Sequence, residues 1–373
     1  MDLTESQAFL VLNALPDIGP VNMRRLLDRV GDDPVALLAS SARELEQVKG
    51  VGATISGTIV HWEDRFDLAY EEARIARAKA KFVTCREPSY PGPLREIYDP
   101  PIGLYQRGDY AFERPAIAIV GNRKTTLYGQ KVAQTLAGEL MVAGFCIVSG
   151  LARGIDTAAH EGALAAGGPT VGVLGTGMDI IYPPENLGLY RKTAANGAVV
   201  SEFPFGRRAD RQSFAMRNRI VAGMSAGVIV IESDVAGGSM ITARFAGEQG
   251  RQLFAVPGRI DQPTSAGCHQ LIRDGAMLVT CVDDILAEFS YLDGLNPTPL
   301  ANKEDDDGGT EEGPPMAEEE ARVHGCFAGG AQLGPDELVG LTGLGISQVT
   351  TALMMLELQR RVAKRTDGRY ELC

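Results

Sequence analysis

The sequence predicts an α/β protein built around a doubly wound, mainly parallel β-sheet. Six apolar, β-rich runs alternate with helical segments, as expected for strands covered on both faces. The 44 glycines among 373 residues also favour many sharp strand-to-helix turns. The predicted strands are 116–120, 145–149, 170–174, 198–201, 228–232 and 253–256. They place the main domain at residues 81–292, with ligands expected beyond the carboxyl ends of the strands.

Residues 1–80 are predicted to form a helical domain of the helix–hairpin–helix or SAM type. Apolar periodicity predicts short helices and then one longer helix that ends at Arg77. Turns at 18–20 and 50–52 lead into new helices and could present backbone N–H groups to a DNA phosphate. DNA contact and a purely structural or partner-binding role both remain open. The predicted short helices are 7–15, 21–30, 34–38 and 42–48.

Residues 293–317 are predicted to be an acidic, disordered linker. The stretch 293–320 holds ten acidic residues and one Lys, which contribute −9 to the formal charge of −12. It is poor in large apolar side chains and therefore has little surface to bury. The rest of the chain carries only −3, so a basic patch on a folded part is compatible with the composition.

Residues 318–373 are predicted to form a winged helix. Helical patterns over 321–327, 335–341 and 346–361 precede a hairpin whose turn is Asp367-Gly368. The third helix of such a domain normally reads a DNA groove, yet its first turns offer only Ser347, Gln348 and Thr350. Duplex-DNA binding, protein contact and a structural role therefore all remain open.

Cysteine, histidine and hydropathy patterns predict a cytoplasmic protein without metal or membrane segments. The six Cys and four His are scattered and form neither a CxxC pair nor a ligand cluster. The N-terminus lacks the basic and apolar regions of a signal peptide, and no run of about 18 apolar residues occurs.

The turns that follow the predicted strands share a chemistry suited to anions. Glycines let the backbone approach a ligand, helix N-termini supply N–H donors, and Arg can bind phosphate through two hydrogen bonds. Neither GxxxxGK[ST] nor GxGxxG occurs, so no nucleotide cofactor is expected, and a row of anion sites suits a polymer. The predicted nucleic-acid-binding residues are Gly121, Asn122, Arg123, Lys124, Ser149, Gly150, Arg153, Gly154, Asp156, Thr157, Gly175, Thr176, Gly177, Arg217, Asn218, Arg219, Gly237, Gly238, Ser239 and Thr242.

Some of these residues have a structural interpretation beside the functional one. Asp156 and His160 stand four residues apart on one helix, where Asp156 would serve as N-cap and turn holder or take part in chemistry. Arg217 and Arg219 would either contact ligand or pair with Glu202 and Glu232. No aromatic residue lies within the predicted turns, but Tyr182, Phe203, Phe205 and Phe214 are near them in the sequence, and one or two of these rings are expected to stack on bases.

These motifs resemble the DNA-processing protein A family (DprA, also called Smf). The matching stretches cover nearly all of 90–280 in order and include AIVGNRKTTLYG, SGLARGIDTAAHEGAL, VLGTGMDIIYPPEN, RNRIVAGMSAGVIVIE and GGSMITARFAGEQGRQLFAVPG. The resemblance implies a Rossmann-like, non-enzymatic domain that binds single-stranded DNA and dimerises. It also implies protection of incoming DNA and loading of RecA recombinase during natural transformation. By the same resemblance, the DNA contacts would be made by Arg123, the turn 149–156, Arg217, Arg219 and the turn 237–239.

The sequence departs from the family pattern at two places. Asn122 stands where Ser is usual, and Pro183-Pro184 stands where some members place Lys. The first change keeps a hydrogen-bonding side chain. The second removes an expected phosphate contact, which Arg191 or Lys192 would replace.

Two alternative functions and the dimer interface complete the predictions. A related Rossmann-like enzyme group cleaves nucleoside monophosphates, but Arg244 stands where those enzymes carry Glu. The other alternative is a winged-helix protein that binds duplex DNA. The apolar stretches 253–260 and 271–272 are the predicted dimer interface.

Overall fold

The computed structural model describes residues 3–16, 18–292, 295, 316–327, 331–365 and 367–372. These residues form two compact units, one with the N-terminal helices and the sheet, the other with the C-terminal helices and hairpin. The predicted linker lies almost entirely outside the described residues, so its disorder stays a prediction.

In the described part of the chain, one large sheet has nine strands in the order β1-β2-β6-β5-β4-β3-β7-β8-β9. The strands from β6 to β9 in this order run parallel, whereas β1 and β2 pair antiparallel at one edge. The prediction of a mainly parallel sheet is therefore confirmed. The strands are β1 (Ala80–Thr84), β2 (Gly103–Arg107), β3 (Ala116–Gly121), β4 (Cys146–Ser149), β5 (Thr170–Leu174), β6 (Ala198–Ser201), β7 (Gly227–Ile231), β8 (Gln252–Ala255) and β9 (Met277–Leu278).

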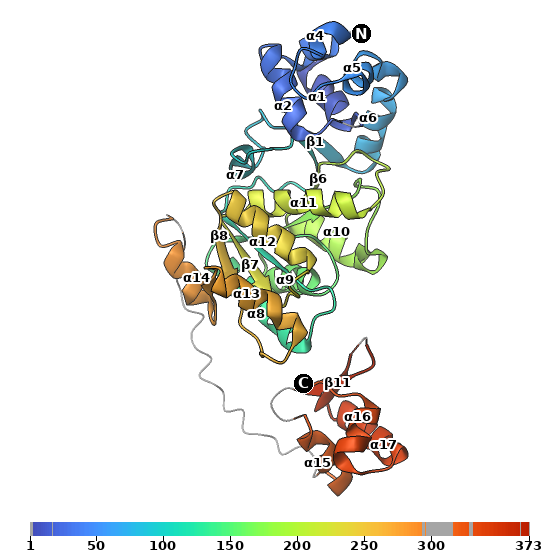
Figure 1. Cartoon of the computed structure of the whole chain (residues 1–373), viewed down its shortest axis with the longest axis vertical. Coiled ribbons are helices and arrows are strands. Elements are labelled where there is room, and N and C mark those ends of the chain that lie inside the picture. Colours follow the sequence, from blue (N-terminus) through green and yellow to red (C-terminus); the bar gives the residue numbers. More distant parts are fainter. Residues whose placement is uncertain are drawn as a thin grey trace. The chain divides into compact units, whose positions relative to one another are not determined.

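Helices cover both faces of this sheet (Figure 1). Alternate strand residues point into two different cores, so Ile119 packs with α8 and α9 while its neighbours Ala118 and Val120 pack with α11, α12 and α13. This arrangement explains why the strands read as continuous apolar runs. The helices are α7 (Gly92–Arg95), α8 (Leu127–Val142), α9 (Ile155–Ala165), α10 (Leu187–Asn196), α11 (Arg211–Gly223), α12 (Gly238–Glu248), α13 (Ala266–Arg273) and α14 (Val282–Glu288).

The N-terminal helices share a core with the sheet. Buried Glu71 of α6 accepts hydrogen bonds from Tyr105 Oη of β2 (2.8 Å) and from the Phe205 backbone N–H (2.9 Å). The predicted boundary at residue 80 therefore separates two sequence patterns within one compact unit. These helices are α1 (Glu5–Ala14), α2 (Pro20–Arg29), α3 (Pro34–Leu38), α4 (Ala42–Leu45), α5 (Ala53–Val60) and α6 (Leu68–Arg77).

The single long helix predicted to end at Arg77 is wrong, because α5 and α6 are separate. A 3-10 turn at Trp62–Asp64 buries the Trp62 ring, and the Asp67 side chain then caps α6 by accepting from the Tyr70 N–H at 2.9 Å. A buried aromatic ring and an N-cap residue together end one helix and begin the next.

The C-terminal unit is a winged helix, as predicted. It comprises α15 (Glu318–Gly325), α16 (Pro335–Thr342), α17 (Ile346–Leu358) and the hairpin of β10 (Val362–Lys364) and β11 (Tyr370–Leu372). Helix α17 ends three residues before the predicted Arg361, because Arg360 adopts a left-handed backbone with φ of 56°.

Among the described residues, no single helix is long and apolar enough to cross a membrane, although α16 and α17 together pass that test as a pair bent by 112°. The described residues also contain no group of three His, Cys, Asp or Glu placed to hold a metal ion.

Candidate nucleic-acid interface

A cavity of about 520 Å³ opens at the carboxyl ends of the central strands. Its walls come from the loops that follow β3, β4 and β7 and from one side of α11. The chain runs from β3 outward to β4 in one direction and returns to the other side of β3 with β7. The cavity thus lies at the point where the strand order reverses, which is where open α/β sheets bind ligands.

Eleven of the twenty predicted binding residues line this cavity. They are brought together from four separate segments of the sequence. The eleven are Gly121, Asn122, Arg123, Gly150, Asp156, Arg217, Asn218, Gly237, Gly238, Ser239 and Thr242.

Arg217 and Asp156 form the charged floor of the cavity. Arg217 is only 4% exposed, and its Nη1 donates to the Val173 carbonyl at 3.0 Å. Its Nε is buried and has no hydrogen-bond partner among the described residues. Burial lowers the pKa of the Arg217 guanidinium and raises the pKa of Asp156, and the attraction between the two charges opposes both shifts. The guanidinium places a positive charge in the cavity wall, which would attract an anion.

Glycines let the loops close around this arginine. A Cβ on Gly150 would lie 1.4 Å from Arg217 Nη1, so only glycine permits this packing. At the adjacent loop, Gly154 has φ of 76° and lies against the Asn122 carbonyl. The close approach joins the loops after β3 and β4 into one wall.

Phe214, one of the four aromatic residues expected near the predicted turns, lies beside Arg123. The Arg123 guanidinium lies 5.0 Å from the centroid of the Phe214 ring, and Phe214 lines the cavity. Tyr182, which is 40% exposed, packs against Phe214 with ring centroids 5.5 Å apart. Arg211, Phe214, Ala215 and Asn218 share one side of α11, so helical spacing back from Asn218 could have identified them.

The other nine predicted residues do not line the cavity, and several of them hold its loops. Ser149 Oγ donates to the Ile119 carbonyl at 2.7 Å, and Thr157 Oγ1 donates to the Ala152 carbonyl at 2.7 Å. Thr176 Oγ1 donates to the Ile180 carbonyl at 2.7 Å, and exposed Arg153 pairs with Glu185. The nine are Lys124, Ser149, Arg153, Gly154, Thr157, Gly175, Thr176, Gly177 and Arg219.

Arg219 is a structural residue in this fold. Its guanidinium is buried, pairs with Glu202 and donates to the Asp99 carbonyl at 2.6 Å. Of the two roles left open for Arg219, the structure places its side chain in the ion pair with Glu202.

Asp156 holds the turn before α9 but does not occupy the N-cap. Gly154 takes that position, and Asp156 lies in the first turn of the helix. Its carboxylate accepts from the backbone N–H groups of Gly150 at 3.1 Å and Ala152 at 3.3 Å. The predicted cap is wrong because the left-handed backbone of Gly154 begins the helix two residues earlier, whereas the predicted turn-holding contact is present.

His160 lies one turn further along α9 and is fully buried. Its Nδ1 lies 2.7 Å from Thr170 Oγ1, and burial lowers its pKa to about 3 from the usual 6.5. Between about pH 6.5 and pH 3, His160 is therefore protonated in the unfolded chain but neutral in the folded protein. Stability should fall as the pH drops through this window, by up to about 1.4 kcal/mol per pH unit.

We expect His160→Gln, which can keep a hydrogen bond to Thr170, to flatten this part of the pH profile. Urea unfolding of both proteins between pH 7 and pH 4.5 measures the difference. Asp156 has the opposite effect on stability. Its pKa is raised in the folded state, so its protonation favours folding as the pH falls, and it does so equally in the wild type and in His160→Gln. Parallel profiles for the two proteins would contradict the assignment to His160.

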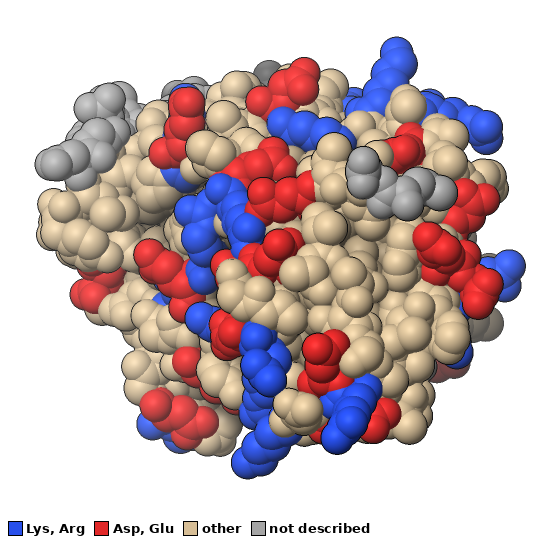
Figure 2. All heavy atoms as spheres, turned by 90° about the horizontal axis from the view of Figure 1, so that it is seen from above, with Lys and Arg blue, Asp and Glu red and all other residues tan. Residues whose placement is uncertain are grey.

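The surface over the N-terminal helices carries both signs of charge. Figure 2 shows Lys and Arg interspersed with Asp and Glu on this side of the molecule. The predicted DNA contact at turns 18–20 and 50–52 therefore gains no support from a broad basic field.

Comparison with known proteins shows which family the chain resembles. The family model described as DNA recombination-mediator protein A matches residues 81–290, and that of the DprA winged helix domain matches residues 310–368. Protein Smf of Synechocystis is 32% identical and covers 99% of both chains. DNA processing protein DprA of Streptococcus pneumoniae is 42% identical over 228 residues, which are 59% of this chain and 79% of the relative.

Solved structures give the same result. The crystal structure of DprA from Streptococcus pneumoniae has a TM-score of 0.67 at 33% identity, covering 77% of this chain and 99% of that one. A Helicobacter pylori DprA structure, described for its single-stranded DNA binding mode, has a TM-score of 0.52 at 32% identity and covers 57% of this chain and 98% of its own. On these matches and on the loops that build the cavity, the chain belongs to the DNA recombination-mediator protein A (DprA/Smf) family.

Proposed function

We propose that this protein binds single-stranded DNA in the cavity at the strand ends, protects it, and loads RecA recombinase onto it during natural transformation. The observation that carries the proposal is the buried guanidinium of Arg217, which lines an open cavity with an unpartnered Nε among the described residues. The guanidinium places a positive charge at the cavity wall, where a phosphate would form charge-assisted hydrogen bonds with it.

The surroundings of Arg217 suit a polynucleotide. Exposed Arg123 and Arg211 add two charges at the cavity wall, and the Phe214 and Tyr182 rings offer surfaces on which bases can stack. Stacking tolerates any base and phosphate contacts carry no sequence information, so binding should be salt-dependent with weak base preference. The Helicobacter pylori relative, whose structure is described for its single-stranded DNA binding mode, supports the same ligand here.

The proposed role is non-enzymatic. An enzyme that cleaves nucleoside monophosphates would carry Glu at position 244, where this chain has Arg. Arg244 is exposed, pairs with Glu248 at 3.5 Å and does not line the cavity. Asp156 does line the cavity, yet one of its two carboxylate oxygens, Oδ2, accepts hydrogen bonds from two backbone N–H groups and so holds the loop. These contacts favour a binding site over an acid–base centre.

The function can be tested by RecA assembly on single-stranded DNA coated with a single-strand-binding protein. We expect this protein to shorten the lag before RecA hydrolyses ATP and to slow nuclease digestion of the bare strand. An unchanged lag at saturating protein would contradict the loading role.

We further propose a homodimer formed through the sheet domain, with Ile260 at the interface. The rest of the predicted interface is largely unavailable, because Phe254, Ala255, Val256 and Leu271 are buried in the cores of the sheet domain. Ile260 is 94% exposed, although a large apolar side chain normally seeks burial, and it lies in the loop that follows β8. We expect Ile260→Glu to convert a dimer into a monomer of 39.8 kDa. Sedimentation equilibrium measures this mass, and a dimer that survives the substitution would move the interface elsewhere.

A further inference from the structure

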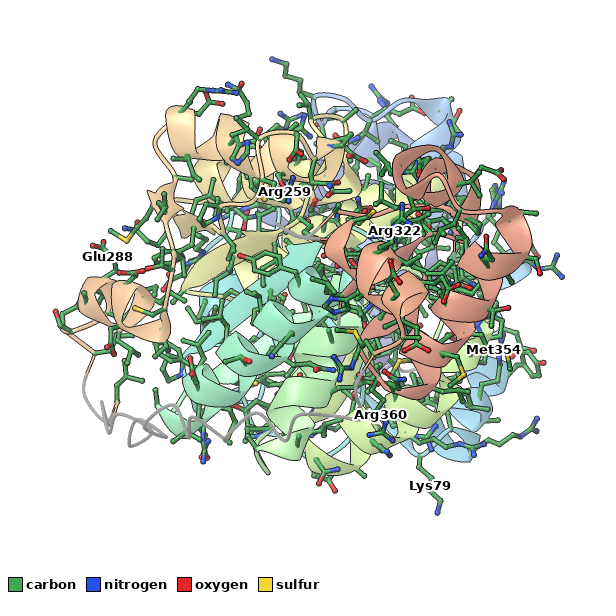
Figure 3. All side chains as sticks on the ribbon, turned by 90° about the horizontal axis from the view of Figure 1, so that it is seen from below. Lys79, Arg259, Glu288, Arg322, Met354 and Arg360 are labelled. Carbon is green, nitrogen blue, oxygen red and sulfur yellow. The ribbon has the colours of Figure 1, made fainter. Side chains whose placement is uncertain are left out.

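The outer side of α17 presents an apolar stripe in the position where a winged helix usually reads DNA. Ile346, Met354 and Leu358 are 53%, 63% and 69% exposed, and with Thr350 they recur every four residues along the helix. Figure 3 shows Met354 extending outward from the helix. The opposite side of α17 packs into the core through Val349, Ala352, Leu353 and Leu356. The stripe is therefore additional to the core-forming face.

The threonines on this side do not make the stripe polar. Thr350 Oγ1 donates to the Ile346 carbonyl at 2.8 Å, and Thr351 Oγ1 donates to the Ser347 carbonyl at 2.9 Å. Because both hydroxyls are satisfied within the helix, burying these side chains would orphan no donor. The helix contains a single charged residue, Glu357, so it lacks the cations that a phosphate backbone requires.

We propose that this stripe, formed by Ile346, Thr350, Met354 and Leu358, pairs with the same stripe on a second copy of the chain. An antiparallel, two-fold arrangement places Ile346 against Leu358 of the second copy and Thr350 against its Met354. Two large aliphatic side chains then meet at each end of the stripe, and the small Thr350 faces the long Met354 at its centre. The pattern pairs with itself, as a two-fold interface requires.

The charges also fit this arrangement. Glu357 would face Ser347 of the second copy, beside the N-terminus of that helix, where a carboxylate is stabilised by the helix dipole. The two Glu357 side chains would lie about 15 Å apart along the helices, because ten residues separate positions 347 and 357 at about 1.5 Å each. Like charges therefore do not meet.

The available area predicts a weak contact. The four side chains of the stripe offer roughly 400 Å² per copy, so that pairing buries roughly 800 Å², below the size of a specific interface. If the sheet domains also dimerise, as proposed above, the second contact becomes intramolecular and a weak interface suffices.

Photo-crosslinking in the full chain tests the pairing. We expect p-benzoylphenylalanine at position 354 to give cross-linked dimers whose adducts map to residues 346–351 of the other copy. The same group at position 98, where Tyr98 is 75% exposed outside the stripe, should give no adduct on α17.

Charge variants provide the matched control. Introducing Leu358→Glu should reduce the cross-link from position 354 at least tenfold. Gln348→Glu adds the same charge beside the stripe and keeps a side-chain oxygen for the Gly345 N–H, which Gln348 accepts at 3.0 Å, so the cross-link should persist. Absence of dimer adducts, adducts only outside α17, or transfer of the label to lipid vesicles would overturn the proposal.

The outcome is separable from the proposed function. Binding of oligothymidine should be equal in the wild type and in Leu358→Glu, because the stripe contains no residue of the cavity. A protein that binds oligothymidine without cross-linking through α17 would refute only the pairing. A protein that cross-links without binding oligothymidine would refute only the DNA site.

Discussion

Replacing Arg219 with Met is expected to destabilise the fold by about 3–5 kcal/mol while leaving the affinity of the folded protein for single-stranded DNA within twofold. The substitution leaves Glu202 as a buried carboxylate without its cation and removes the donor to the Asp99 carbonyl. An orphaned buried charge is costly, whereas loss of both partners is tolerated far better. Urea unfolding and oligothymidine anisotropy on the same preparation measure the two quantities.

The double variant Arg219→Met, Glu202→Gln provides the control. We expect it to recover a large part of the lost stability, since the charge of Glu202 is removed and only the more exposed Asp99, 3.5 Å from Arg219 Nε, loses its cation. Loss of DNA binding in a folded Arg219→Met protein would show that this arginine contacts the strand after all.

Replacing Gly150 with Ala is expected to weaken oligothymidine binding at least tenfold and to lower stability by about 1–3 kcal/mol. The new methyl group would occupy the place of Arg217 Nη1, and the buried guanidinium is held by the Val173 carbonyl, so it cannot move aside freely. The displaced guanidinium would no longer hold its charge in the same place at the cavity wall.

Gly138→Ala is the matched control for Gly150→Ala. Its Cβ would meet only ordinary contacts, the Gly162 carbonyl at 3.6 Å and the Ala166 Cβ at 3.8 Å, inside helix α8. We expect a gain of about 0.5–1 kcal/mol from helix propensity and unchanged DNA affinity. Equal DNA affinity for both variants would refute the role assigned to the Arg217 contact.

The central strands could be predicted because burial on both faces demands unbroken apolar runs. Strands β1, β2 and β9 escaped prediction for physical reasons. β9 has only two residues, and β1 at the edge is half exposed and mixes Lys81 with Phe82, so neither gives a clear periodic signal. Antiparallel pairing of β1 and β2 depends on tertiary contacts that no local pattern records.

The residues of the candidate site that lie in loops after strands could be predicted from the sequence. The residues that helix α11 contributes were harder to predict. Arg217 and Arg219 are two residues apart, which places their side chains on nearly opposite sides of α11. Only one of them can face the cavity, but the sequence alone does not say which side of the helix faces it. Phe214 could be named only as one of four nearby aromatic residues for the same reason, since it enters the cavity from α11 and not from a strand end.

The most direct test of the DNA site is the anisotropy of labelled oligothymidine titrated with the wild type and with Arg123→Glu at low and moderate salt. Arg123 is exposed at the cavity wall and stacks on Phe214, so its reversal should not disturb the core. We expect tight, salt-sensitive binding by the wild type and at least a tenfold loss in the variant, because reversal removes one phosphate contact and adds repulsion. Unchanged binding by a folded Arg123→Glu protein would contradict the assignment of the strand to this cavity.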